Sequence, residues 1–80
     1  MSRQVVVYST PLCAPCERLK GWLNRRGVPF MVRDLMLDQE AAERVEAAGV
    51  MSAPALEVDG RILSGPALAT DKLEALFPAS

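Results

Sequence analysis

The chain of 80 residues has no histidine and only two cysteines, Cys13 and Cys16. A small secreted scaffold usually carries several scattered cysteine pairs, so the lack of further cysteines excludes that class. Zinc sites and iron–sulfur clusters normally take four ligands, and these two cysteines would need a second chain or outside thiols to complete such a site. In a reducing compartment a single close pair is more often catalytic or metal-binding than structural.

An excess of one charge and a long apolar run are lacking as well. Nine Lys and Arg residues stand against ten Asp and Glu residues, a net charge of −1 that gives no reason to expect nucleic acid or an anionic membrane as a partner. Arg25 and Arg26 are interpreted as a solvated helix end. No segment reaches the roughly 18 to 20 apolar residues of a membrane span, and the four apolar residues before Ser9 are too few for a secretory signal. We therefore expect a cytoplasmic protein with one domain over residues 1–80, no membrane association and a monomeric state.

Strand and helix patterns alternate along the chain. Short apolar runs predict strands over residues 5–8, 30–34, 55–58 and 61–63, and helical spacing predicts helices over residues 14–26 and 39–48 and a last helix containing Leu68, Leu73, Leu76 and Phe77. Asp38 and Thr70 are the expected N-caps of the second and third helices, and Asp59–Gly60 predicts a hairpin. The order β-α-β-α-β-β-α predicts an α/β domain, in which a four-stranded mixed sheet begins with a right-handed parallel crossover and carries helices on both faces.

The two cysteines lie where the first strand gives way to the first helix, in the motif Cys13–Ala14–Pro15–Cys16. Disulfide exchange needs a thiolate, and the unpaired N–H groups and dipole at a helix N-terminus favour that anion. We expect Cys13, at or just before the N-cap, to attack a substrate disulfide, and Cys16, one turn further on the apolar face, to resolve the mixed disulfide. Pro15 fits because a proline in the first helical turn loses no hydrogen bond. A purely stabilising bridge is disfavoured because so short a loop removes little chain entropy.

These residues resemble the glutaredoxin family, and within it the NrdH-redoxin branch, over nearly the whole chain. The resemblance rests on Val7–Tyr8–Ser9, Cys13–Ala14–Pro15–Cys16, Gly27–Val28–Pro29, Asp34, Gly49, Ala53–Pro54 and Ser64–Gly65. It implies a thioredoxin-like, glutaredoxin-type fold and a thiol–disulfide oxidoreductase with Cys13 and Cys16 as its redox-active pair and no tightly bound cofactor. Protein disulfides, with ribonucleotide reductase among them, are then the expected substrates, and thioredoxin reductase with NADPH is the electron source in the NrdH branch.

The resemblance also implies a substrate groove beside the cysteines. In this family the proline matching Pro54 is cis, and the backbone of the residue matching Ala53 pairs with the bound peptide or thiol. The substrate-binding residues expected on this basis are Thr10, Ala14, Pro15, Ser52, Ala53, Pro54 and Gly65.

Two departures from the family pattern concern the electron source. Thr10 replaces the lysine that usually lies three residues before the first cysteine. The segment Ser64–Gly65–Pro66–Ala67 lacks the acidic residue that holds the α-amino group of glutathione, and it also lacks the aromatic and arginine residues that follow in NrdH-redoxins. A general disulfide reductase therefore stays open beside an NrdH-like donor. A glutathione-dependent glutaredoxin is a further alternative, and a dimeric metal or iron–sulfur carrier using the same cysteine pair is the alternative from another class.

The remaining conspicuous side chains are interpreted as structural. We expect Trp22 to pack in the core rather than to serve as a substrate platform, and Asp34 to be a surface carboxylate rather than a proton acceptor for Cys16. Thioether side chains can bind copper, but gap-filling in the core is the better account of the three scattered methionines, Met31, Met36 and Met51. Met51 is also expected near the substrate groove, because it lies three residues before Pro54.

Overall fold

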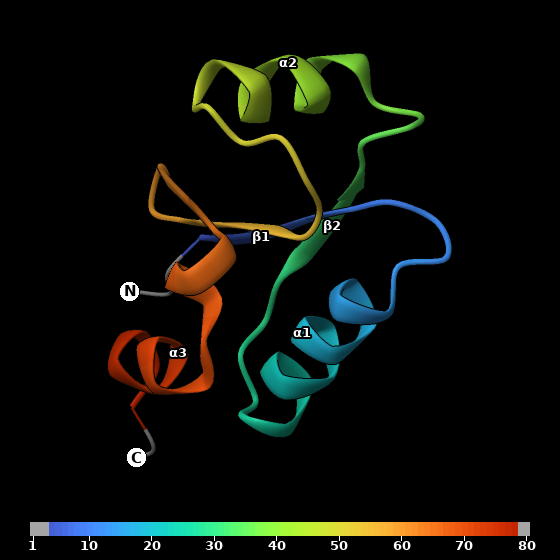
Figure 1. Ribbon diagram of the computed structural model, residues 1–80. Helices are drawn as coiled ribbons and strands as arrows, with labels where there is room; N and C mark the ends of the chain where they lie inside the picture. Colours follow the sequence, from blue (N-terminus) through green and yellow to red (C-terminus); the bar gives the residue numbers. More distant parts are fainter. Residues whose placement is uncertain (1–3, 79–80) are drawn as a thin grey trace.

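The structure of this protein, a computed structural model, describes residues 4–78. Figure 1 shows its elements, which are β1 (Val5–Ser9), α1 (Ala14–Arg25), β2 (Met31–Asp34), α2 (Gln39–Ala47), β3 (Ala55–Val58), β4 (Arg61–Ser64), the 3₁₀ helix η1 (Gly65–Leu68) and α3 (Thr70–Leu76). The predicted order of strands and helices is confirmed, with η1 as the one addition. Each strand and each of the first two helices ends within one residue of its predicted bounds.

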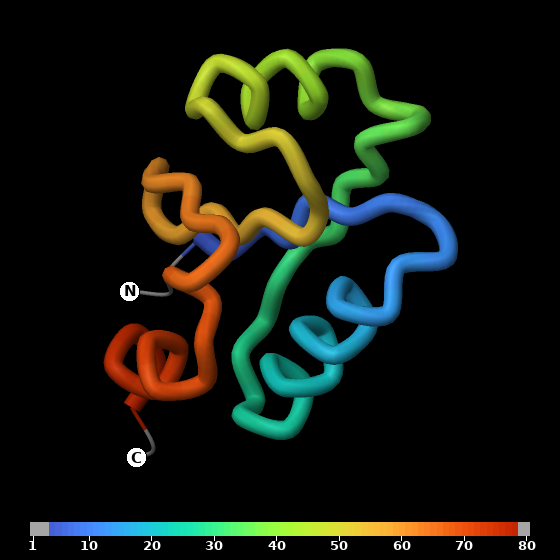
Figure 2. Tube along the Cα trace, in the orientation of Figure 1, coloured from blue at the N-terminus to red at the C-terminus, as the bar shows by residue number. Residues whose placement is uncertain are grey.

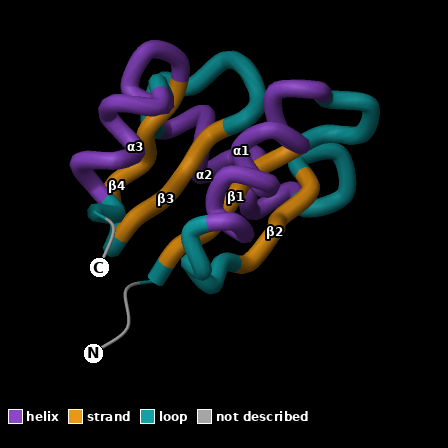
Figure 3. The backbone as a smooth tube through the Cα atoms, turned by 90° about the horizontal axis from the view of Figure 1, so that it is seen from below, coloured by secondary structure: helices purple, strands orange, loops and turns teal. Residues whose placement is uncertain are grey.

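The four strands form one mixed sheet in the order β2-β1-β3-β4. The central strand β1 pairs in parallel with β2, where Val7 lies opposite Val32, and antiparallel with β3, where Val7 lies opposite Leu56. β3 and β4 form the predicted antiparallel hairpin (Figure 3). The C-terminal ends of β1 and β2 and the start of β3 therefore lie at the same end of the sheet. The loops at this end carry the cysteine pair and Pro54.

The helices cover both faces of the sheet, with α1 and α3 on one side and α2 on the other (Figures 1 and 2). Because side chains alternate along a strand, Val7 and Tyr8 of β1 enter different cores. The larger core, under α1 and α3, is made of Val5, Val7, Leu19, Leu23, Leu56, Val58, Leu73 and Phe77. The smaller core, under α2, is made of Tyr8, Ala41, Val45, Val50 and Ala55.

Two local signals in the sequence have the structural role predicted for them. Asp38 caps α2, because its Oδ1 accepts the backbone N–H of Ala41 at 3.0 Å. Asp59 and Gly60 join β3 to β4 with φ angles of 49° and 90°. Both values are positive, as the tight type I′ hairpin turn requires, and Gly60 adopts its value without the strain of a side chain.

The prediction that Thr70 caps the last helix was wrong. Thr70 is the first residue of α3, and the cap is Ala69, whose side chain makes no capping hydrogen bond. The reason is η1, which the sequence analysis did not anticipate: Pro66 suits the first turn of a helix, and the turn closes with the Ala69 N–H donating to the Pro66 carbonyl at 3.2 Å. The chain therefore leaves one helical turn at Ala69 and enters the next at once.

The prediction that the methionines fill gaps in the core was also wrong. Met31, Met36 and Met51 expose 69%, 71% and 91% of their surface. Met31 belongs to β2, a strand at the edge of the sheet, and Met36 and Met51 lie in connections outside the helices and strands. Long apolar side chains at such positions have no second layer to pack against.

A polar network fastens α2 to the sheet, where the core is thin. The Tyr8 hydroxyl donates to Glu57 Oε1 at 2.6 Å, and Arg44 of α2 donates to the two oxygens of the same carboxylate at 2.7 and 2.9 Å. Beside them the Arg33 guanidinium lies 6.0 Å from the centre of the Tyr8 ring and pairs with Asp38 at 2.8 Å. α2 buries only Ala41 and Val45, so these contacts supply much of its attachment.

This network predicts a loss of stability in acid. The hydrogen bonds from Arg44 hold the pKa of Glu57 below its usual value. A carboxyl whose pKa is lower in the folded state stabilises the fold above its unfolded pKa, near 4.3 for Glu, and loses that contribution as the pH falls through the folded pKa. We expect the free energy of unfolding, measured with urea, to fall between about pH 5 and pH 3. In a Glu57→Gln variant the free energy of unfolding should fall less steeply with decreasing pH than in the wild type. The two slopes can differ by at most about 1.4 kcal/mol per pH unit, because one carboxyl takes up one proton.

The lowered pKa of Asp38, caused first by Arg33, acts in the same direction, so Glu57→Gln should remove only part of the slope. Glu46→Gln is a matched control on α2, because within residues 4–78 the Glu46 side chain makes no hydrogen bond or ion pair. It should leave the slope as in the wild type. Equal slopes in the Glu57→Gln variant and the wild type would contradict the role given to the network.

Candidate active site

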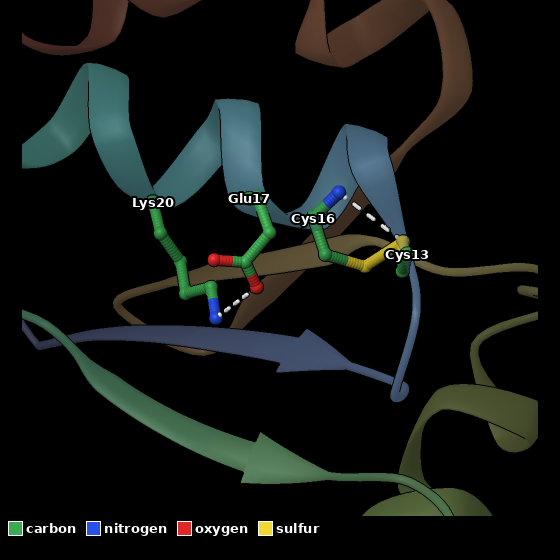
Figure 4. Close-up of a disulfide and its surroundings, with 4 residues drawn as sticks. All are labelled: Cys13, Cys16, Glu17 and Lys20. Atoms are coloured by element: carbon green, nitrogen blue, oxygen red, sulfur yellow. Dashed lines mark hydrogen bonds and ion pairs between the residues drawn. A yellow bond between two sulfur atoms is a disulfide. The ribbon is translucent and has the colours of Figure 1, made fainter.

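The N-terminus of α1 holds the two cysteines, which are joined by a disulfide with their Cα atoms 5.2 Å apart (Figure 4). Cys13 is the N-cap, and its Sγ accepts the backbone N–H of Cys16 at 3.2 Å. Its backbone carbonyl accepts the N–H of Glu17 at 3.1 Å, the first turn of the helix. The sulfur thus takes the position that a serine or aspartate oxygen takes in an ordinary cap. A thiolate formed there has a backbone N–H and the positive end of the helix beside it.

The two sulfurs differ in their access to solvent. Cys16 is fully buried, whereas Cys13 is half-buried at the surface. Leu12, directly before Cys13, has a φ of +56° and a fully exposed side chain. A left-handed conformation is unusual for a residue with a branched side chain and is typical of functional turns. The asymmetry between Cys13 and Cys16 agrees with the one predicted from their positions on the helix.

A groove of about 540 Å³ includes Pro15, which lies between the two cysteines in the sequence, and runs between α1 on one side and the Pro54 loop, η1 and α3 on the other. The Ala53–Pro54 peptide bond is cis, as the resemblance implied. Five of the predicted substrate-binding residues line this α1 groove: Pro15, Ser52, Ala53, Pro54 and Gly65. Residues from three distant parts of the sequence are therefore brought together at one site.

The other two predicted substrate-binding residues lie elsewhere. Thr10 lines a second hollow of about 470 Å³, on the α2 side of the Pro54 loop, together with Met51. Met51 therefore lines this hollow and not the α1 groove, where it was expected. Ser52 and Ala53 line both hollows, so they form the ridge between the α1 groove and this α2 hollow. Ala14 is exposed and lines neither hollow.

Trp22 has two roles, packing in the core, as predicted, and lining the α1 groove. It packs against the larger core, with its ring 6.2 Å from that of Phe77, and it also lines the α1 groove. Arg26, interpreted as part of a solvated helix end, instead stacks 4.8 Å from the centre of the Trp22 ring and pairs with Glu74 at 3.4 Å. That interpretation was wrong for Arg26, because α3 packs beside the end of α1.

Two groove residues, Arg18 and Arg25, were missed altogether. With Trp22 they follow the spacing i, i+4, i+7, which places all three on one side of α1. Asp34 is half-buried, and its Oδ1 accepts the Met36 N–H at 2.8 Å, so it shapes the turn after β2. This contact is a structural one, and the interpretation that Asp34 is no proton acceptor for Cys16 stays a prediction.

Among residues 4–78, no group of three or more His, Cys, Asp or Glu side chains is placed to hold a metal ion. The cysteine pair alone would offer two ligands. No helix in the same part of the chain is long and apolar enough to cross a bilayer.

A four-stranded mixed sheet between helices, with a cysteine pair at the start of the first helix and a cis-proline loop beside it, defines the thioredoxin-fold class of dithiol proteins. Within that class, the model of the glutaredoxin family matches residues 5–63. The chain therefore belongs to the glutaredoxin family, and the predicted fold and family are confirmed.

Individual relatives agree with this assignment. The chain is 39% identical over 59 residues to NADPH-dependent thioredoxin reductase 3 of Arabidopsis thaliana and 38% identical over 56 residues to the Gene 56 protein of Mycobacterium phage L5. These matches cover 66% and 69% of this chain but 11% and 54% of the two relatives, so the chain corresponds to only part of each. The structure of the glutaredoxin-like protein NrdH-redoxin from Escherichia coli superposes with a TM-score of 0.82 at 26% identity, covering 96% of this chain and 99% of that one.

Proposed function

We propose that this protein reduces disulfides in other proteins, with Cys13 as the nucleophile and Cys16 as the resolving thiol. The observation that carries the proposal is the Cys13 sulfur at the cap of α1, accessible and within 3.2 Å of a backbone N–H, next to a fully buried Cys16. Ser52, Ala53 and Pro54 line the α1 groove together with Pro15, the residue directly before Cys16, so an extended substrate bonded to Cys13 can lie in it.

The reaction takes place in two exchanges. The Cys13 thiolate attacks one sulfur of the substrate disulfide, which forms a mixed disulfide and releases the other substrate sulfur as a thiolate. The Cys16 thiolate then attacks the Cys13 sulfur, which closes the Cys13–Cys16 disulfide and releases the second substrate thiolate. Two electrons pass from the protein dithiol to the substrate, and the two thiolates released take up protons from solvent.

The proposed electron source is thioredoxin reductase with NADPH rather than glutathione. Among the described residues that line the α1 groove, Glu17 is the only carboxylate, and it is paired with Lys20 at 2.6 Å (Figure 4). An acidic partner for the α-amino group of glutathione is therefore not provided there, and charged hydrogen bonds of this kind contribute about 1.5–3 kcal/mol. Support also comes from the resemblance to NrdH-redoxin, whose E. coli member is described as having a thioredoxin-like activity profile.

The test compares NADPH consumption with insulin as the disulfide substrate under two regimes. One regime supplies thioredoxin reductase, and the other supplies glutathione with glutathione reductase. We expect turnover with thioredoxin reductase to exceed turnover with glutathione by at least about tenfold, the equivalent of one lost charged contact. Turnover with glutathione alone would contradict the proposed electron source and would identify a glutathione-dependent glutaredoxin.

The proposed substrates are therefore protein disulfides, with that of ribonucleotide reductase as one candidate, and thioredoxin reductase is the proposed partner that supplies electrons. No bound cofactor takes part. We propose that the protein acts as a monomer in the cytoplasm.

A further inference from the structure

The charges on the two sides of the Ser52–Ala53 ridge are opposite. In the α1 groove the charged side chains are Arg18, Arg25 and Glu17, and Glu17 is neutralised by Lys20 at 2.6 Å. In the α2 hollow the charged side chain is Glu46. A substrate chain that crosses the ridge from one hollow to the other therefore meets positive charge on the α1 side and negative charge on the α2 side.

Within the part of the chain that the structure describes, the two arginines of the groove have no charged partner. Both are exposed, and within residues 4–78 neither takes part in an ion pair or a side-chain hydrogen bond. Their neighbour Arg26, by contrast, is occupied by Trp22 and Glu74. A guanidinium presents several N–H donors in a fork that matches a carboxylate. Arg18 and Arg25 thus leave two such forks free along the groove.

The spacing of the arginines relates them to a bound peptide. Helical rise is 1.5 Å per residue, so along α1 Arg18 lies about 8 Å and Arg25 about 18 Å beyond Cys13. An extended peptide advances about 3.3 Å per residue. A peptide whose cysteine is bonded to Cys13 would therefore place a side chain beside Arg18 at about two residues from that cysteine and one beside Arg25 at about five. The long arginine side chains widen both positions. The floor between them is apolar, formed by Leu19, Leu68 and Leu73.

We propose, on the basis of the function proposed above, that the α1 groove binds the segment of a protein substrate next to its reacting cysteine. The groove selects segments that carry a carboxylate about two to five residues from that cysteine. A carboxylate on the opposite side of the substrate cysteine would instead lie near Glu46 and be repelled. The selection therefore depends on the order of residues in the substrate. The partner is thus a protein with an acidic stretch on one side of its disulfide cysteine.

The test uses short peptides in which one cysteine is joined by a disulfide to 2-thio-5-nitrobenzoate. Attack by Cys13 on the peptide sulfur breaks that disulfide and releases the coloured thiolate, and Cys16 then releases the peptide thiol. One pair of peptides has glutamate or glutamine three residues before the cysteine, and a second pair has them three residues after it. The protein is reduced beforehand, the reductant is removed, and a single turnover is followed at low salt.

We expect the glutamate peptide of one order to react about two- to fivefold faster than its glutamine counterpart, from one exposed ion pair of ordinary strength. The ratio should fall toward one in 0.5 M NaCl, because salt screens exposed charges. It should also fall toward one in an Arg18→Gln, Arg25→Gln double variant. In an Arg18→Glu, Arg25→Glu variant, a peptide with lysine at the same position should become the faster substrate.

Arg61→Gln is the matched control. Arg61 is an exposed arginine on β4 and does not line the α1 groove, so this variant should keep the wild-type ratio. Glu46→Gln should reduce the difference between the two residue orders. Circular dichroism and thermal unfolding of each variant show whether its fold is retained.

An unchanged ratio in the double variant, or equal rates for glutamate and glutamine peptides in both orders, would overturn the proposal. The mixed disulfide of glutathione with the same chromophore is a further substrate in the series. An equal dependence of its rate on Arg18 and Arg25 would mean that the groove binds the tripeptide, which also overturns the proposal. Failure of the proposed function gives a different result, because no peptide would then release the chromophore faster than with a Cys13→Ser variant.

Discussion

A Cys13→Ser variant is expected to lose disulfide reduction down to the rate measured without protein. Cys16, the sulfur that remains, is fully buried and cannot meet a protein disulfide, and a serine hydroxyl is not ionised at neutral pH. The measurement is insulin reduction with dithiothreitol as the electron source, followed by precipitation of the free B chain. Activity in the Cys13→Ser variant above the background would show that Cys13 is not the nucleophile.

The partner variant, Cys16→Ser, serves as the control because it changes the same atom three residues away. It keeps the accessible nucleophile and loses the second exchange, so we expect it to form mixed disulfides that persist. Mass spectrometry after incubation with a disulfide peptide should find one peptide bound per Cys16→Ser chain and none per Cys13→Ser chain. Trapping in the Cys13→Ser variant instead would reverse the two roles.

The second large effect is expected from Leu23→Ala, which removes the side chain that fixes α1 to the sheet. Leu23 is fully buried in the larger core, beside Val7 and Leu56. Truncation of a buried leucine usually costs about 2–5 kcal/mol, partly from the lost transfer of the side chain and partly from the cavity left behind. The whole free energy of unfolding of a small domain is about 5–15 kcal/mol. The urea concentration at the midpoint of unfolding of the oxidised protein should therefore fall steeply.

Asn24→Ala is the matched control for this experiment. Asn24 is the next residue of α1 and is exposed, so its replacement should change the free energy of unfolding by no more than about 0.5 kcal/mol. A loss below 1 kcal/mol for Leu23→Ala would mean that α1 is not held to the sheet by this side chain.

The features that could be predicted from the sequence are those that a few neighbouring residues determine. Four consecutive apolar residues followed by Ser9 predict a buried strand, and Asp38 before an alanine-rich segment predicts a cap, whatever the rest of the chain does. The cysteine pair belongs to the same group, because its position between strand and helix is visible in the local pattern. From that position it follows that Cys13 caps the helix and that Cys16 is the more deeply buried of the two.

The features that could not be predicted depend on which segments meet in space. Nothing near Tyr8 in the sequence indicates Glu57, 49 residues away, or the bidentate Arg44 beyond it. The exposure of Met31 follows from the place of β2 at the edge of the sheet, which a strand pattern does not reveal. Arg25 could be seen as a charge at a helix end, but its role as a wall of the groove depends on η1 and α3 packing opposite α1.

Different faces of α1 have different roles. One side packs Leu19 and Leu23 into the core, the N-terminal end holds the reacting sulfur, and a third side, with Arg18, Trp22 and Arg25, lines the groove. Because the exposed arginines of that third side contribute neither to the core nor to the sulfur's hydrogen bond, they are free to diverge between descendants of one gene. Gene copies that differ at these positions can therefore acquire different protein substrates while they keep the same redox chemistry. Substitutions at Arg18 and Arg25 are likewise the way to change the substrate preference by design.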